Sequence, residues 1–155
     1  MAACEPADEG FFTSAPTRFV ETFNIARPAQ QVWEELTSDR PLDWCRLLSI
    51  TWKSPRPFGV GTARQAKVAF GFLTVQERFF IWEEGRRKAF YVTSANLPMF
   101  KRFAEDYVIE PTGTDSCTFT WTLAAEPTAL GKVGAPGNAL IIKSLFADTR
   151  KHFAG

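Results

Sequence analysis

The chain has 155 residues, the usual size of one domain, and its 45% hydrophobic content excludes a disordered protein. Its 18 basic and 17 acidic residues leave a net charge of +1 and form no basic stripe, so we expect no nucleic-acid partner. The 15 Phe, 5 Trp and 2 Tyr residues provide large apolar contact areas, either for a core or for the wall of a cavity.

Three cysteines, Cys4, Cys45 and Cys117, are odd in number and far apart. This spacing gives neither a disulfide framework nor a metal knuckle, so a reducing, cytoplasmic location is predicted, with no metal and no cofactor. The first residues lack the basic and apolar regions of a signal peptide. No apolar run approaches the ~18 residues of a membrane-spanning helix.

The N-terminal part predicts a flexible tail over residues 1–17, because small, acidic and Pro residues dominate there. A strand follows over residues 18–25. Val32, Trp33 and Leu36 then recur at helical spacing after Pro28, which favours a short helix over residues 29–37. A second short helix is predicted over residues 40–47.

Alternation of period two then predicts about six strands joined by short turns. It is clearest near the end, where Cys117, Phe119, Trp121 and Leu123 share one face and threonines share the other. A Gly- and Pro-rich linker over residues 127–137 precedes a long amphipathic helix over residues 138–153. The strands are expected over residues 49–54, 62–70, 72–82, 88–94, 101–109 and 116–124.

Consecutive strands with hairpin connections indicate an antiparallel meander, and one amphipathic helix must cover one face of it. The fold class is therefore α+β: a curved antiparallel sheet of about seven strands around a long C-terminal helix, with two short helices after the first strand. Residues 18–155 form the single domain.

Four segments in this order resemble the START-like, helix-grip superfamily (SRPBCC), and within it the polyketide cyclase/dehydrase and lipid-transport branch. They are residues 25–33 (Ile-Ala-Arg-Pro-Ala-Gln-Gln-Val-Trp), Trp44, residues 57–62 (Pro-Phe-Gly-Val-Gly-Thr), and residues 113–122. The resemblance covers residues 18–153. It implies an apolar ligand cavity between the sheet and the C-terminal helix. No functional residue is implied by a shared motif, so the site must come from the inward-facing side chains.

The inward faces of the strands and of the last helix provide the candidate ligand-binding residues. These are Trp44, Phe79, Phe103, Tyr107, Phe119, Trp121, Ile142 and Phe146.

Four polar residues share those faces: Arg64, Glu77, Glu105 and Tyr107. A carboxylate in an apolar cavity must be paired, hydrogen-bonded or protonated, and Arg64 is the partner for Glu77 or Glu105. They are the catalytic candidates, for proton transfer or for binding a ligand oxygen. A structural ion pair, or a register shifted by one residue that turns them to solvent, are the alternatives.

Three functions are compatible with these features. The first is binding or transport of an apolar or aromatic small molecule, such as a lipid or polyketide. The second is a cyclase or dehydratase that uses the cavity carboxylates. The third is a protein-interaction module or homodimer, if Phe72, Phe80 and Trp82 form an apolar outer face. The single His152, near the chain end, excludes His-based nucleophilic catalysis.

Overall fold

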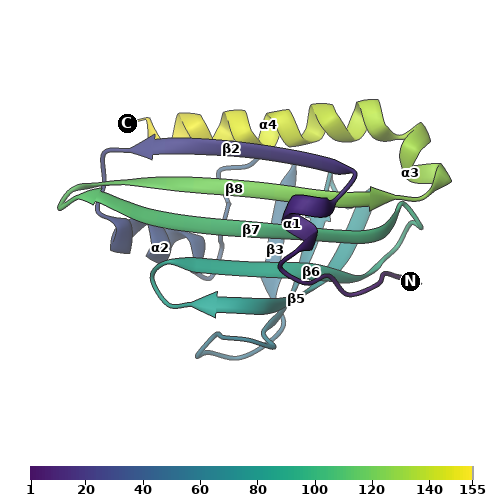
Figure 1. Cartoon of the computed structure of the whole chain (residues 1–155), viewed down its shortest axis with the longest axis horizontal. Coiled ribbons are helices and arrows are strands. Elements are labelled where there is room, and N and C mark those ends of the chain that lie inside the picture. Colours follow the sequence, from purple (N-terminus) through teal and green to yellow (C-terminus); the bar gives the residue numbers. More distant parts are fainter. Residues whose placement is uncertain (155) are drawn as a thin grey trace.

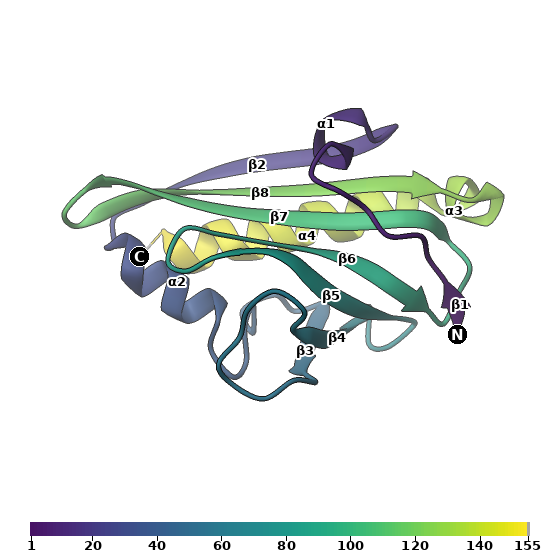
Figure 2. The same cartoon turned by 60° about the horizontal axis from the view of Figure 1, so that its bottom comes forward.

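A computed structural model describes residues 1–154. Seven antiparallel strands form one curved sheet in the order β2-β8-β7-β6-β5-β4-β3, and the long helix α4 (Ala135–Phe153) lies in its concave side (Figures 1 and 2). The helix-grip architecture predicted from the sequence is confirmed. The strands are β2 (Thr17–Ile25), β3 (Leu48–Trp52), β4 (Ala63–Val68), β5 (Leu73–Glu83), β6 (Arg87–Ala95), β7 (Phe100–Gly113) and β8 (Ser116–Pro127).

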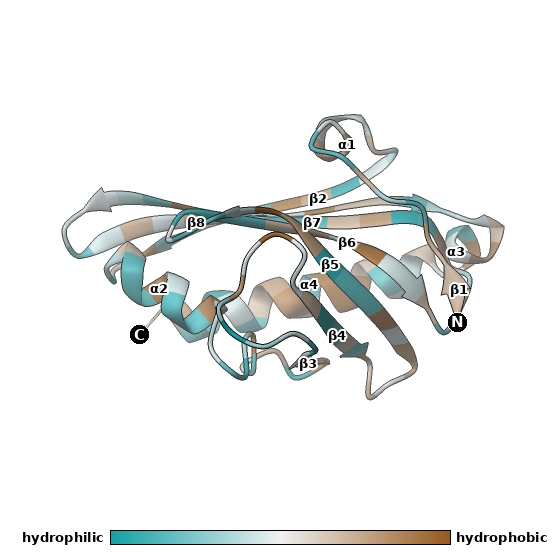
Figure 3. Ribbon diagram, turned by 90° about the horizontal axis from the view of Figure 1, so that it is seen from below, coloured by the Kyte–Doolittle hydropathy of each residue, from teal (hydrophilic) through white to brown (hydrophobic). Residues whose placement is uncertain are grey.

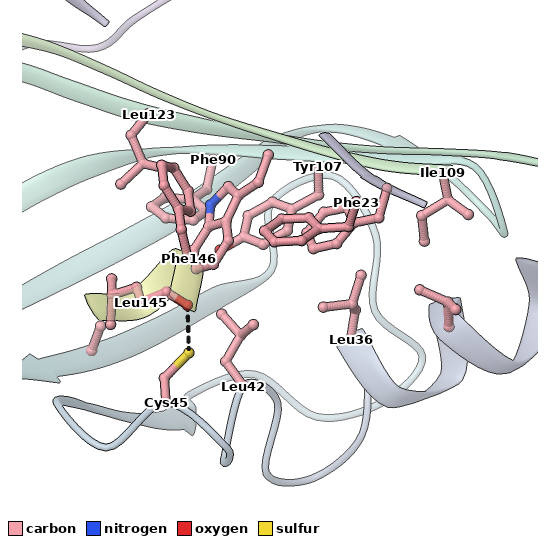
Figure 4. Packing of buried hydrophobic residues seen from close by; sticks show 14 of the residues in the cluster. Phe23, Leu36, Leu42, Cys45, Phe90, Tyr107, Ile109, Leu123, Leu145 and Phe146 are labelled. Atoms are coloured by element: carbon pink, nitrogen blue, oxygen red, sulfur yellow. Dashed lines mark hydrogen bonds between the residues drawn. The ribbon is translucent and has the colours of Figure 1, made fainter. Parts of the chain in front are cut away.

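The core fills the space between the sheet and α4. The predicted alternation in β8 is observed, with Phe119 and Trp121 fully buried and Thr118, Thr120 and Thr122 on the other face. Aromatic side chains from neighbouring strands continue this layer, as in the stacked pair Phe23 and Phe119, 5.5 Å apart. Figure 4 shows Leu36 and Leu42 closing the core from the opposite side. No helix among residues 1–154 is long and apolar enough to cross a membrane.

Two predictions about the helices are corrected. The first short helix is present as α2 (Ala29–Leu36), but residues 40–47 form turns and no second helix. Leu42 has a φ of 58°, a left-handed conformation outside the helical region, and its side chain is buried. Core burial therefore outweighs the local helical spacing. The predicted linker contains a short helix, α3 (Ala129–Val133), and α4 begins at Ala135, earlier than expected.

The first 16 residues pack on the sheet, where the sequence predicts a flexible tail. The short strand β1 (Ala2–Ala3) pairs with the end of β6, and the Glu5 N–H donates to the Lys101 carbonyl of β7 at 2.8 Å. Direct pairing of β6 with β7 stops at Tyr91, so this segment fills the gap between them. The helix α1 (Phe11–Ser14) then covers the outer face of the sheet (Figure 2).

The outer face is therefore less apolar than the sequence suggests. Phe11 and Phe12 are buried there against alanines of three strands, and the Phe12 ring stacks 6.1 Å from Phe80. A register shift between Phe79 and Ile81 turns Trp82 to the inside, where its ring lies 5.5 Å from Trp33. Of the three residues predicted to form an exposed apolar face, only Phe72 is exposed.

Replacing Phe12 with alanine tests the contribution of the N-terminal segment. Because Phe12 is buried, Phe12→Ala should lower the free energy of unfolding by roughly 3 kcal/mol, measured by urea denaturation. The matched control is Phe72→Ala, which removes a ring that is 71% exposed and should change the stability by less than about 0.5 kcal/mol. If Phe12→Ala changed the free energy of unfolding as little as Phe72→Ala does, the packing of the N-terminal segment would add no stability.

Candidate functional site

A cavity of about 310 Å³ lies between the concave face of the sheet and α4. Its wall is mostly apolar, and the polar groups Arg64, Glu77, Glu105 and Tyr107 lie among its lining. Two lining residues, Phe72 and Gly137, are solvent-exposed and mark its mouth, between the β4–β5 turn and the start of α4. Apolar lining side chains include Ile50, Ala66, Val75, Phe103, Leu123 and Leu145.

An ion pair holds the polar part of the wall. Arg64 on β4 lies directly opposite Glu77 on β5 in the sheet register, and Arg64 Nε donates to Glu77 Oε1 at 2.5 Å. Both side chains are almost completely buried. Removing a charge from water costs several kcal/mol, so each group depends on the other. Burial raises the pKa of Glu77, and the Arg64 charge offsets this only in part.

One nitrogen of the Arg64 guanidinium is left without a hydrogen bond within residues 1–154. Arg64 Nη2 donates to Tyr107 Oη at 3.2 Å, whereas the buried Nη1 has no hydrogen-bond partner among residues 1–154. The faces of Phe79 and Phe90 lie 5.0 and 4.8 Å from the guanidinium carbon and provide cation–π attraction. The structure thus leaves one buried nitrogen donor of Arg64 unsatisfied within residues 1–154, which is rare in folded proteins.

Glu105 is the second polar centre. Its Oε1 accepts hydrogen bonds from Tyr107 Oη and Trp121 Nε1, both at 2.8 Å, and its Oε2 has no partner among the residues described. Burial and the Glu77 charge raise the pKa of Glu105 to about 7, against the effects of Arg64 and the two hydrogen bonds. The carboxyl group can therefore take up or release a proton near neutral pH.

Lys88 is a buried cation that the sequence reasoning missed. Its Nζ donates to the Leu36 carbonyl at 2.6 Å and lies 4.8 Å from the centre of the Tyr107 ring. Burial, together with the nearby Arg64 charge, lowers its pKa well below the ordinary value. The signal was present, since Lys88, Phe90 and Val92 alternate on the inner face of β6. Lys88 is not among the residues that line the cavity.

The other predicted binding residues divide into two groups. Phe103, Trp121 and Ile142 line the cavity, as do the four predicted polar residues. Phe79, Phe119 and Phe146 face the same way but pack within the core, and Trp44 lies beyond it.

Trp44 and His152 form a separate contact near the C-terminal end of α4. Their rings stack 3.9 Å apart, and the Trp44 indole N–H donates to Thr149 Oγ1. His152 Nε2 lies 2.8 Å from Glu35 Oε1 and is absent from the cavity lining. No group of three or more His, Cys, Asp and Glu side chains within residues 1–154 could hold a metal ion.

The model of one protein family, described as polyketide cyclase / dehydrase and lipid transport, matches residues 16–153. The chain belongs to this family. Uncharacterised proteins of Mycobacterium tuberculosis and Mycobacterium bovis are each 35% identical to it over 130 residues, which cover 80% of this chain and 74% of theirs. The residues of this family member that form the cavity all lie within the matched range.

Solved structures support the fold at low sequence identity. A START superfamily protein from Mycobacterium smegmatis superposes with a TM-score of 0.68 at 12% identity, over 88% of this chain and 97% of the other. The ZhuI aromatase/cyclase from a Streptomyces species superposes with a TM-score of 0.69 at 14% identity, over 87% and 89% of the two chains. At these identities the likeness shows the shared fold alone.

The raised pKa of Glu105 predicts a pH-dependent stability. Below its unfolded pKa the carboxyl is protonated in both states. As the pH rises toward 7 the unfolded state loses the proton first, which favours unfolding. Between pH 5 and pH 8 this group should lower the free energy of unfolding by on the order of 2 kcal/mol.

Urea denaturation at a series of pH values checks this prediction. In the Glu105→Gln protein, the free energy of unfolding should no longer fall between pH 5 and pH 8 by the amount that this carboxyl contributes in the parent chain. Glu110→Gln, on the same strand but exposed, is the control and should keep the parent profile. Parallel profiles for the parent chain and Glu105→Gln would contradict a raised pKa.

Proposed function

We propose that this protein binds an apolar small molecule in the cavity between the sheet and α4, with a ligand oxygen placed at Arg64. The observation that carries this proposal is an apolar cavity whose lining includes Arg64, a buried guanidinium whose Nη1 has no hydrogen-bond partner among residues 1–154. Its volume of about 310 Å³ lies at the lower end of the range for ligand pockets, about 300–1,000 Å³.

The lining favours a ligand with an apolar body and a polar group at one end. Phe103, Leu123 and Ile142 offer only apolar surface, which suits rings or an acyl chain. Arg64 Nη1 can donate to a carbonyl, hydroxyl or carboxylate oxygen. Glu105 Oε2 can accept from a hydroxyl when ionised or donate when protonated, so it tolerates either kind of group. Membership of a family that includes lipid transport agrees with this ligand class.

Filling the cavity tests the binding proposal. Ala66 lines the cavity from β4, and Ala66→Phe should reduce binding of an apolar fluorescent probe at least ten-fold by occupying its space. Ala147→Phe adds the same ring on the exposed side of α4 and should bind like the parent chain. Trp121 lines the cavity and is one of five tryptophans, so the change in total tryptophan emission on probe binding gives a second readout.

Native mass spectrometry of gently purified protein gives a test that needs no variant, since an apolar cavity retains its ligand. Absence of any retained mass, together with undiminished probe binding by a folded Ala66→Phe protein, would refute the proposal.

A cyclase-type reaction is the second candidate, and the pKa of about 7 for Glu105 is the observation that favours it. A general base works best when its pKa is near the working pH. Glu105 Oε2 would take a proton from a ligand carbon next to a carbonyl. The electron pair of the broken C–H bond would move to the carbonyl oxygen, where the Arg64 N–H stabilises the negative charge.

Glu105→Gln distinguishes the two functions. The amide keeps the shape of the side chain but cannot act as a base. If the protein is an enzyme, the variant should bind the ligand recovered from the cavity within about three-fold of the parent and lose at least ~100-fold of its turnover. Product analysis by mass spectrometry measures this. Equal product formation by the variant would exclude Glu105 as the base and leave binding as the function.

A further inference from the structure

The rim of the cavity mouth carries exposed apolar side chains. Of the eight large apolar residues that are exposed within residues 1–154, four lie on the β4–β5 turn or at the corner between α3 and α4. These elements lie in the same half of the molecule and contribute Phe72, Gly134 and Gly137 to the cavity lining (Figure 3). We call the four the apolar collar: Phe70, Phe72, Leu130 and Val133.

The backbone of the β4–β5 turn holds part of this collar in water. Ala69 and Phe70 have φ values of 51° and 60°, which side-chain-bearing residues adopt rarely, and Gly71 follows at 89°. The result is a Phe70 ring that is 91% exposed. Packing within this chain does not explain an exposed ring on a strained turn, because the ring contributes almost no burial.

The charges around the collar are of one sign. The three segments at the mouth, residues 67–74, 96–101 and 128–138, contain three lysines and not one of the chain's 17 acidic residues. Lys101 pairs with Glu5 and Glu126 from outside these segments. Lys67 and Lys132 are exposed and have no carboxylate within 4 Å among the residues described. The chain as a whole is nearly neutral, so this is a local feature.

We propose that the apolar collar and its two lysines, Lys67 and Lys132, dock the cavity mouth onto an anionic lipid bilayer. Exposed apolar side chains beside lysines bind such surfaces, because rings enter the boundary of the acyl chains while ammonium groups stay among anionic headgroups. The collar side chains project separately from a turn and a helix corner. A bilayer accepts separate side chains, whereas a protein partner must match them with a continuous complementary surface.

Docking would let an apolar ligand pass between the bilayer and the cavity without crossing water. The mouth lies between the two halves of the collar, since Phe72 and Gly137 line the cavity and belong to the collar elements. Vesicle binding by the collar does not depend on an occupied cavity, so the two proposals can fail separately.

Co-sedimentation with vesicles tests this proposal. The parent chain should bind vesicles of phosphatidylcholine with phosphatidylglycerol more tightly than phosphatidylcholine alone, and salt should weaken the binding. Phe70→Ser with Phe72→Ser should lower the partition coefficient at least ten-fold. Val20→Ser with Val60→Ser, two exposed apolar residues outside the collar, is the matched control and should bind like the parent. Lys67→Glu with Lys132→Glu should remove the preference for phosphatidylglycerol.

Three results would overturn the proposal: no binding of the parent chain to either vesicle, undiminished binding by the double serine variant of the collar, or an equal loss in the control. The replaced residues are all exposed, so unchanged thermal unfolding should accompany each variant. Ala66→Phe, which fills the cavity and leaves the collar intact, should still bind vesicles. Loss of probe binding without loss of vesicle binding in that variant would separate this inference from the proposed function.

Discussion

The buried ion pair between Arg64 and Glu77 is the constraint on which the site depends. The pairing of β4 with β5 puts the two residues opposite each other, and the closed core removes both from water. Removing either partner would leave an uncompensated charge, at a cost of about 3–5 kcal/mol. The position of the guanidinium is thereby fixed. One of its remaining nitrogens then holds the Tyr107 hydroxyl, and the other, Nη1, stays without a partner among residues 1–154.

Much of this could be predicted from local alternation. Side chains two residues apart in a strand point the same way, and this placed Arg64, Glu77, Glu105 and Tyr107 on the inner face. Alternation identifies the face of the sheet on which a side chain lies, but it does not tell how deeply the side chain is buried there. Phe79 and Phe119 share that face with the cavity residues, but other rings cover them. Whether an inward residue lines a cavity or fills the core depends on which side chains from other elements pack over it.

The features that were missed depend on contacts between distant parts of the chain. The left-handed Leu42 is held by burial in the core, against a local sequence that favours a helix. The register shift after Phe79 turns Trp82 inward, and the alternation of residues along the strand gives no sign of this shift. Lys88 can be buried because its ammonium group donates a hydrogen bond to the Leu36 carbonyl oxygen at the end of α2. Tertiary packing decides each of these features, and a short stretch of neighbouring residues carries no information about contacts with distant parts of the chain.

The N-terminal segment has a consequence for the integrity of the sheet. The family match begins at residue 16, so the part that fills the gap between β6 and β7 lies outside it. A chain shortened to that boundary would leave backbone N–H and C=O groups unpaired near Thr93 and Lys101. Open strand edges recruit extended segments from other molecules. The first residues thus occupy backbone groups with which strands of other molecules could pair. Shorter forms of the protein should therefore aggregate more readily.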